Sequence, residues 1–80
     1  MEQPDYYIKD EGEFLLIGFK TQKAKDAIKT AIENQTGFVG NNQEIMLNQL
    51  NEIFEMCICP GSKNNFISWA ISHNLRGEYF

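Results

Sequence analysis

Two apolar segments near the start of the chain, separated by a short polar turn, predict a β-hairpin. Residues 5–9 (DYYIK) centre on aromatic and β-branched side chains, and residues 13–20 (EFLLIGFK) are mostly apolar. Side chains of these types are favoured in strands. Gly12 lies between the segments and can adopt the positive φ that a short hairpin loop requires. We therefore predict antiparallel strands at 5–9 and 13–20.

The second of these strands is apolar on both faces. Because side chains alternate along a strand, its residues fall into two sets: Leu15, Ile17 and Phe19 on one face, and Phe14, Leu16 and Gly18 on the other. A strand of this kind is usually central in its sheet and covered on both sides. The rest of this short chain covers two faces only thinly, so the pattern also predicts self-association as a homodimer.

Three later segments place apolar residues at helical spacing. Thr21 is a candidate N-cap for the first helix. Gly37 is its expected stop, with Phe38 folding back onto the helix. The apolar stripe of this helix is Ala24, Ala27, Ile28, Ala31 and Ile32.

A second helix is predicted from Asn41 and Glu44, whose spacing resembles a capping box. Its expected apolar stripe is Met46, Leu47, Leu50, Ile53, Phe54 and Cys57. Ile45 and Met56 fall outside this stripe and have no predicted place in the core. The sequence CPGS ends the helix, because proline and glycine do not continue it.

Ser62 is positioned to cap a third helix. The buried stripe of this helix is predicted to be Phe66, Ile67, Ala70, Ile71 and Leu75. Gly77 ends the helix, and residues 78–80 (EYF) can pair as a short third strand. The whole pattern predicts a single α+β domain over residues 1–80, in which an N-terminal antiparallel hairpin packs with three α-helices.

The composition is that of a folded acidic domain. Hydrophobic residues make up 42% of the chain, too many for a disordered segment. The formal net charge of −4 and the pI of about 4.8 oppose a general nucleic-acid binder, whose affinity comes from neutralising phosphates. The N-terminal segment lacks the basic and apolar regions of a signal peptide, and the longest apolar run is too short to span a bilayer. We expect a cytoplasmic protein.

Four of the seven lysine and arginine residues lie within residues 20–29: Lys20, Lys23, Lys25 and Lys29. Cations at a helix start oppose the helix dipole, whereas the free N–H groups there attract anions. The segment is therefore a candidate anion-binding site for phosphate, carboxylate or an acidic partner. The alternative is a solvated polar face, in which the lysines form weak surface pairs with nearby carboxylates.

A second candidate site lies on the third helix. Trp69, His73 and Arg76 follow i, i+4 and i+7 spacing along the edge of the buried stripe, and Tyr79 comes shortly after. Trp, Tyr and Arg are enriched at binding hot spots, so these four residues are predicted to contact a partner. In the alternative, Trp69 completes a small core that needs every large side chain, with His73 at its margin.

The residue types of an enzyme or a metal site do not come together in this sequence. Cys57 and Cys59 flank a single residue, without the paired spacing of structural zinc sites or of redox pairs. His73 is the one histidine, and neither a nucleophile–base pair nor a phosphate-binding loop accompanies it. We predict no catalytic residue, no metal ligand and no cofactor.

Segregated charge, unplaced apolar residues and the lack of catalytic chemistry together predict a small non-enzymatic protein-binding module. We expect it to inhibit or modulate a partner protein by occupying a basic surface, without a membrane partner. Phage-encoded inhibitors of host or defence enzymes offer an analogy of size and charge. The alternative is a nucleic-acid, nucleotide or anion-binding domain that uses the Lys20–Lys29 patch, or a third helix that reads base edges.

Overall fold

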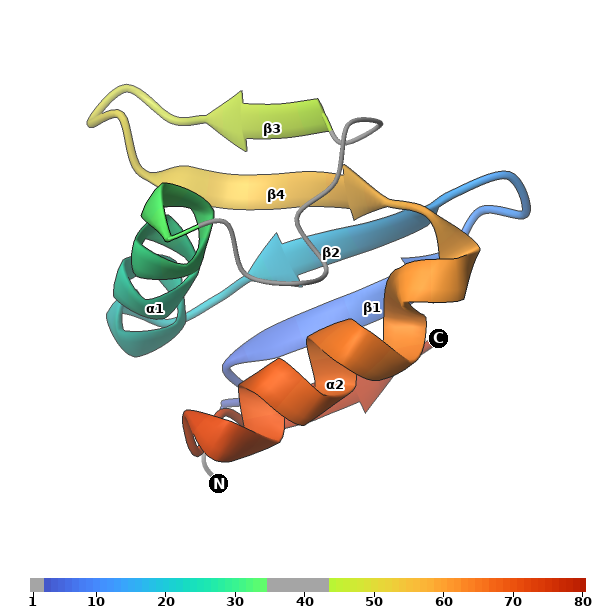
Figure 1. Ribbon diagram of the computed structural model, residues 1–80. Coiled ribbons are helices and arrows are strands. Elements are labelled where there is room, and N and C mark those ends of the chain that lie inside the picture. The colour runs from blue at the N-terminus through green and yellow to red at the C-terminus, as the bar shows by residue number, and fades with distance from the viewer. Residues whose placement is uncertain (1–2, 35–43) are drawn as a thin grey trace.

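The computed structural model describes residues 3–34 and 44–80 of the chain. Five strands form one mixed sheet, and two α-helices pack against the same face of it (Figure 1). The strands are β1 (Tyr6–Asp10), β2 (Leu15–Phe19), β3 (Glu44–Leu47), β4 (Ile53–Ile58) and β5 (Gly77–Tyr79). The helices are α1 (Gln22–Glu33) and α2 (Lys63–Ser72), and a short 3-10 turn at Pro60–Ser62 precedes α2.

The strand order across the sheet is β3-β4-β2-β1-β5. Neighbouring strands are antiparallel, except for β1 and β5, which run parallel. The predicted N-terminal hairpin forms as β1 and β2, and its turn uses Gly12 at a φ of 92°. β2 is the middle strand of the five. In the described parts of the chain, however, helices cover only one of its faces.

The predicted architecture, a hairpin packed with three helices, is wrong. The structure is α+β, but it has a five-stranded mixed sheet and two α-helices. Residues 44–58, predicted as the second helix, form the antiparallel hairpin of β3 and β4. The side-chain oxygen of Asn48 accepts hydrogen bonds from the amides of Leu50 and Glu52 at 2.9 and 3.0 Å. Asn51 takes a left-handed φ of 59°, which asparagine tolerates in turns.

Tertiary pairing explains why β4 is a strand. Aromatic and β-branched residues in IFEMCI suit a pleated, half-buried surface. Pairing with β2 sets Met56 opposite Ile17 and buries it fully, although the helical pattern left Met56 outside the core. A short apolar run fits both a helix and a strand, and the long-range partner decides between them.

The hydrophobic core lies between the two helices and one face of the sheet. Three of the five predicted stripe residues of α1 are fully buried there, and the other two pack against the core. The buried core residues are Tyr6, Ile8, Leu15, Ile17, Phe19, Ala24, Ile28, Ala31, Ile53, Met56, Ile58, Phe66, Trp69, Ala70 and Leu75. The strands that contribute buried side chains to this core are β1, β2 and β4, while β3 and β5 lie at the two edges of the sheet.

The N-termini of the two helices differ in their capping. Thr21 caps α1 as predicted, since its hydroxyl oxygen accepts the amide hydrogen of Ala24 at 3.2 Å. Ser62 makes no capping hydrogen bond to α2 through its side chain, and Ile71 is 67% exposed, so both of these predictions for the last helix are wrong. The predictions for Gly37, Phe38 and Asn41 lie outside the described residues.

Candidate binding face

The face of the sheet opposite α1 and α2, here called the open face, is formed by directly paired residues of all five strands. Paired residues of neighbouring strands point to the same side of a sheet, so the register identifies the members of this face. They are Tyr7, Lys9, Leu16, Gly18, Glu44, Met46, Glu55, Cys57 and Glu78. The open face therefore combines an aromatic ring, a thiol and four charged groups on one sheet.

Tyr7 is the centre of this face. A Cβ added to Gly18 would lie 2.1 Å from Cε1 of Tyr7, so the ring of Tyr7 lies directly on the backbone of β2 at Gly18. The Tyr7 hydroxyl donates a hydrogen bond to a carboxylate oxygen of Glu55 at 3.3 Å. Burial, and then the charge of Glu55, raise the pKa of Tyr7. The phenol is thus held flat against the sheet in its neutral form.

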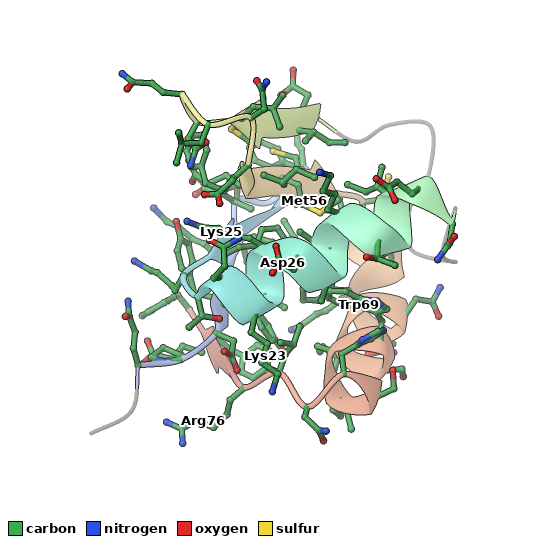
Figure 2. The ribbon with its side chains drawn as sticks, turned by 90° about the vertical axis from the view of Figure 1, so that its left-hand side faces the viewer. Lys23, Lys25, Asp26, Met56, Trp69 and Arg76 are labelled. Atoms are coloured by element: carbon green, nitrogen blue, oxygen red, sulfur yellow. The ribbon has the colours of Figure 1, made fainter. Side chains whose placement is uncertain are left out.

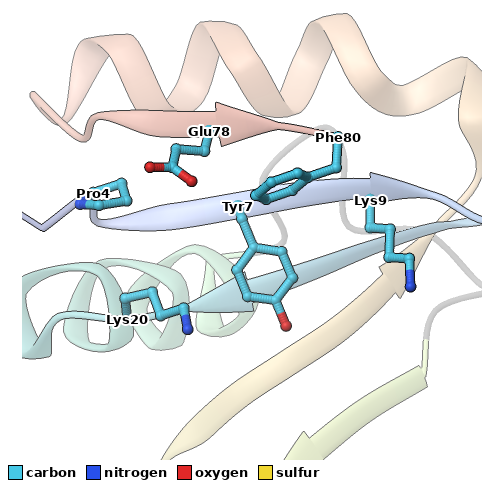
Figure 3. A pocket seen from close by; sticks show the side chains of 6 residues that line it. All are labelled: Pro4, Tyr7, Lys9, Lys20, Glu78 and Phe80. Atoms are coloured by element: carbon cyan, nitrogen blue, oxygen red, sulfur yellow. The ribbon is translucent and has the colours of Figure 1, made fainter.

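A cavity of about 450 Å³ opens beside Tyr7, and Figure 3 shows the six residues that line it: Pro4, Tyr7, Lys9, Lys20, Glu78 and Phe80. The ammonium nitrogen of Lys20 lies over the Tyr7 ring, 5.2 Å from its centroid. The Phe80 ring meets Tyr7 edge to face, with 6.1 Å between centroids. Lys9 pairs with Glu11 at 3.4 Å. The cavity therefore joins two aromatic rings, two cations and one carboxylate.

The β3–β4 half of the open face is acidic. Cys57 lies there, 9% exposed, and burial raises the pKa of its thiol first. The charges of Glu44, Glu55 and Glu11 raise it further, and the register sets Glu44 directly opposite Cys57. Cys57 and Cys59 are both free thiols. The predicted place of Cys57 on a helical stripe is wrong, because it lies on β4.

The four lysines of the predicted anion-binding patch are divided among three cavities. Lys20 lies at the open face beside Tyr7. Lys23 lines a separate cavity and donates a hydrogen bond to the backbone oxygen of Asn74 at 3.0 Å. Lys25 and Lys29 line a third cavity, where Lys25 pairs with Glu52 at 3.7 Å. Figure 2 shows Lys23 and Lys25 on opposite sides of α1.

The four predicted partner-binding residues of the C-terminal region also separate. Trp69 is 7% exposed and lies in the core, with its ring centroid 5.1 Å from that of His73. Tyr79 lies on β5, where its hydroxyl is 3.2 Å from that of Tyr6. Arg76 lines the same cavity as Lys23, away from Trp69. The structure therefore brings Trp69 and His73 together and places the other two residues elsewhere.

Asp5 connects three segments beside this last cavity. Its carboxylate accepts a hydrogen bond from the Thr21 hydroxyl at 2.7 Å and one from the Arg76 amide at 2.8 Å. Burial acts to raise the pKa of Asp5, but these two hydrogen bonds and the charges of Lys23 and Arg76 outweigh burial and lower it. The Asp5 carboxylate thus ties the start of α1 to the segment that enters β5.

Sequence analysis missed Tyr7, Glu55 and Phe80 as site residues. One signal was present: Gly18 interrupts an otherwise apolar strand, and a glycine in a strand often marks the close approach of another group. Which group approaches depends on the register of β1 against β2 and of β2 against β4. That register follows from pairing and was not readable from local pattern.

Comparisons with protein-family models, with curated proteins and with solved structures gave no significant match to this chain. Among residues 3–34 and 44–80, no group of three or more His, Cys, Asp and Glu side chains is arranged to hold a metal ion. Neither α1 nor α2 has the length and apolar character to cross a bilayer, and the described ranges hold no other α-helix. The argument for function therefore rests on the open face itself.

Proposed function

We propose that this protein is a small non-enzymatic binding module of the cytoplasm that inhibits or modulates a partner protein by occupying a basic surface on it. The observation that supports this proposal is the placement of Glu44 and Glu55 beside Cys57 on the open face, where Glu44 pairs directly with Cys57 and Glu55 lies two residues along β4. Electrostatic potentials of opposite sign on the two sides of an interface steer association and exclude wrong partners. A basic surface is the complement of this half of the sheet.

The form of the open face suits such a role. Rigid strands hold the carboxylates in fixed positions, and Glu55 is further fixed because it accepts the Tyr7 hydroxyl hydrogen bond. Half-buried Leu16 and Met46 add apolar contact area between the charges. An apolar centre with a charged rim is the usual anatomy of a protein interface.

A capture experiment with matched charge reversals tests the proposal. Tagged wild-type protein is compared with Glu44→Lys on the open face and with Glu33→Lys at the end of α1, on the other side of the sheet. Both variants change the net charge equally. We expect a specific basic partner to be retained by wild type and by Glu33→Lys and to be lost from Glu44→Lys. Equal capture by all three proteins, or no salt-sensitive partner, would overturn the proposal.

Heparin chromatography tests the alternative of nucleic-acid or anion binding through Lys20–Lys29. Lys25 and Lys29 are the two members of that segment that share a cavity, and Asp26 and Glu52 line the same cavity. The proposal predicts that wild-type protein passes through heparin at low salt. Retention that disappears in a Lys25→Gln, Lys29→Gln double variant would favour the alternative.

A further inference from the structure

The cavity beside Tyr7, at the β1–β5 side of the open face, carries more positive than negative side chains, although the chain as a whole is acidic. The whole protein has 7 cationic and 11 acidic side chains. Among residues 3–34 and 44–80, the side chains that line this cavity include the two cations Lys9 and Lys20 and one carboxylate, that of Glu78. The same lining includes the two aromatic rings of Tyr7 and Phe80. We propose that this cavity binds a nucleoside phosphate, with the base on the Tyr7 ring and the phosphate at Lys20.

The Tyr7 ring provides a flat and fixed platform. One face of the ring is held against Gly18, where no side chain separates it from the strand. Its hydroxyl is anchored on Glu55, so the ring cannot rotate freely away from the sheet. In Figure 3 the ring presents its other face outward, between Lys20 and Lys9. A planar base stacks on an aromatic face of this kind regardless of its sequence identity.

Phe80 extends the platform on the side of β5. Its ring is 71% exposed and stands edge to face against Tyr7. The two rings form a corner. In it, Tyr7 contacts the face of a bound base and Phe80 contacts one edge of the base. The volume of about 450 Å³ lies within the range of small-molecule sites, roughly 300–1,000 Å³.

The charged side chains of the cavity suit the phosphate and the ribose of a nucleotide. The ammonium of Lys20 lies over the Tyr7 ring, 5.2 Å from its centroid, so a base that stacks on the ring takes the place of the ammonium, and the attached phosphate falls within reach of the displaced lysine. Lys9 pairs with Glu11, which leaves Lys20 as the principal phosphate-binding cation. Glu78 lies on the rim, and a carboxylate accepts hydrogen bonds from ribose hydroxyls. The residues that line this cavity differ from Glu44 and Cys57 of the acidic half, and the two sites are joined through Glu55, which holds the Tyr7 hydroxyl.

Amide chemical-shift titrations of the full chain test the site with four probes: adenosine monophosphate, adenosine, inorganic phosphate and a short oligothymidylate. We expect adenosine monophosphate to shift the amides of β1 and β5 in a saturable way. Adenosine should bind more weakly, and phosphate alone should leave these amides unchanged. Tighter binding of the oligonucleotide than of the monophosphate would identify single-stranded nucleic acid as the source of the ligand. The reverse order would identify a free nucleotide.

Three variants make the test specific. Lys20→Gln should weaken adenosine monophosphate about three- to tenfold, as expected for one charged contact at an exposed site, and should leave adenosine binding unchanged. Phe80→Ala should weaken both ligands without unfolding the exposed end of the chain. Lys63→Gln, an equal loss of charge at the start of α2, is the control and should change neither. Shifts that do not saturate, or an affinity for adenosine monophosphate that is the same in Lys20→Gln as in wild type, would overturn the proposal.

Discussion

Replacing Gly18 by alanine probes the contact on which the open face is built. The new methyl group would lie 2.1 Å from Cε1 of Tyr7, well inside the separation of about 3.5–4.0 Å at which two carbon atoms rest in contact. The backbone of a central strand cannot move to relieve the overlap. The Tyr7 ring must therefore lift from the sheet, and its hydroxyl must leave Glu55.

The magnitude follows from two opposing effects. Overpacking that displaces a side chain costs about 1–3 kcal/mol, whereas alanine in place of glycine within a strand returns about 0.5–1 kcal/mol. We expect a net loss of about 1–2 kcal/mol in the free energy of unfolding. For a domain of this size, that loss lowers Tm by roughly 5–15 °C.

A double-mutant cycle identifies Tyr7 as the cause. Urea denaturation measures the free energy of unfolding of wild type, Gly18→Ala, Tyr7→Ala and the double variant. In the Tyr7→Ala background the overlap is absent, so Gly18→Ala should be neutral or slightly stabilising there. The two substitutions should thus couple by about 1–3 kcal/mol. If Gly18→Ala costs the same in both backgrounds, or nothing in wild type, the stacking of Tyr7 on β2 is refuted.

Four further predictions concern other parts of the fold. Gly77→Ala should cost more than Gly18→Ala in the same urea titration, because the overlapping Tyr6 ring is 1% exposed and has no route to solvent; an equal or smaller cost contradicts this. Trp69→Ala should cost about 3–5 kcal/mol as a core residue, and a stability near that of wild type would instead favour its predicted role at an interface. The lowered pKa of Asp5 contributes stability above its ordinary value of 3.8 that is lost as pH falls through the folded-state pKa. Asp5→Asn should therefore flatten the acid side of a Tm-against-pH curve, and an unchanged acid side would show that this carboxylate has no such role. Self-association through the open face predicts sedimentation heavier than the 9.2 kDa chain, and a monomer at high micromolar concentration excludes the homodimer.

The elements that sequence analysis predicted correctly are those specified by local signals. Gly12 between two apolar segments located the first hairpin, and Thr21 before a clean apolar stripe located α1. The third predicted helix forms as α2, although it ends at Ser72 and not at Gly77, and the short C-terminal strand forms as β5, which begins at Gly77. In the first hairpin and in α1, a turn or cap residue and the hydrophobic period agree, so no distant partner is needed to choose between structures.

Residues 44–58 show where local reasoning fails. Their apolar positions fit a helical stripe, yet Asn48 and Asn51 form a tight turn in the middle of the segment. β4 then pairs with β2, a strand far away in sequence. The open face could not be predicted for the same reason, since Tyr7, Gly18 and Glu55 meet only when three strands are in register. Long-range pairing, which a local pattern does not encode, determines both the fold and the candidate site.

The parallel pairing of β1 with β5 sets an order of events during synthesis of the chain. β1 meets β2 across a short turn, but its other neighbour comes from far along the chain, where Asp5 and Arg76, 71 positions apart, join beside this pairing. Closing so long a loop costs entropy and slows folding. Until Gly77–Tyr79 emerge, one edge of β1 stays unpaired, and unpaired edges recruit strands from other molecules. Detachment of this three-residue strand alone would turn the sheet into a template for strand exchange between chains.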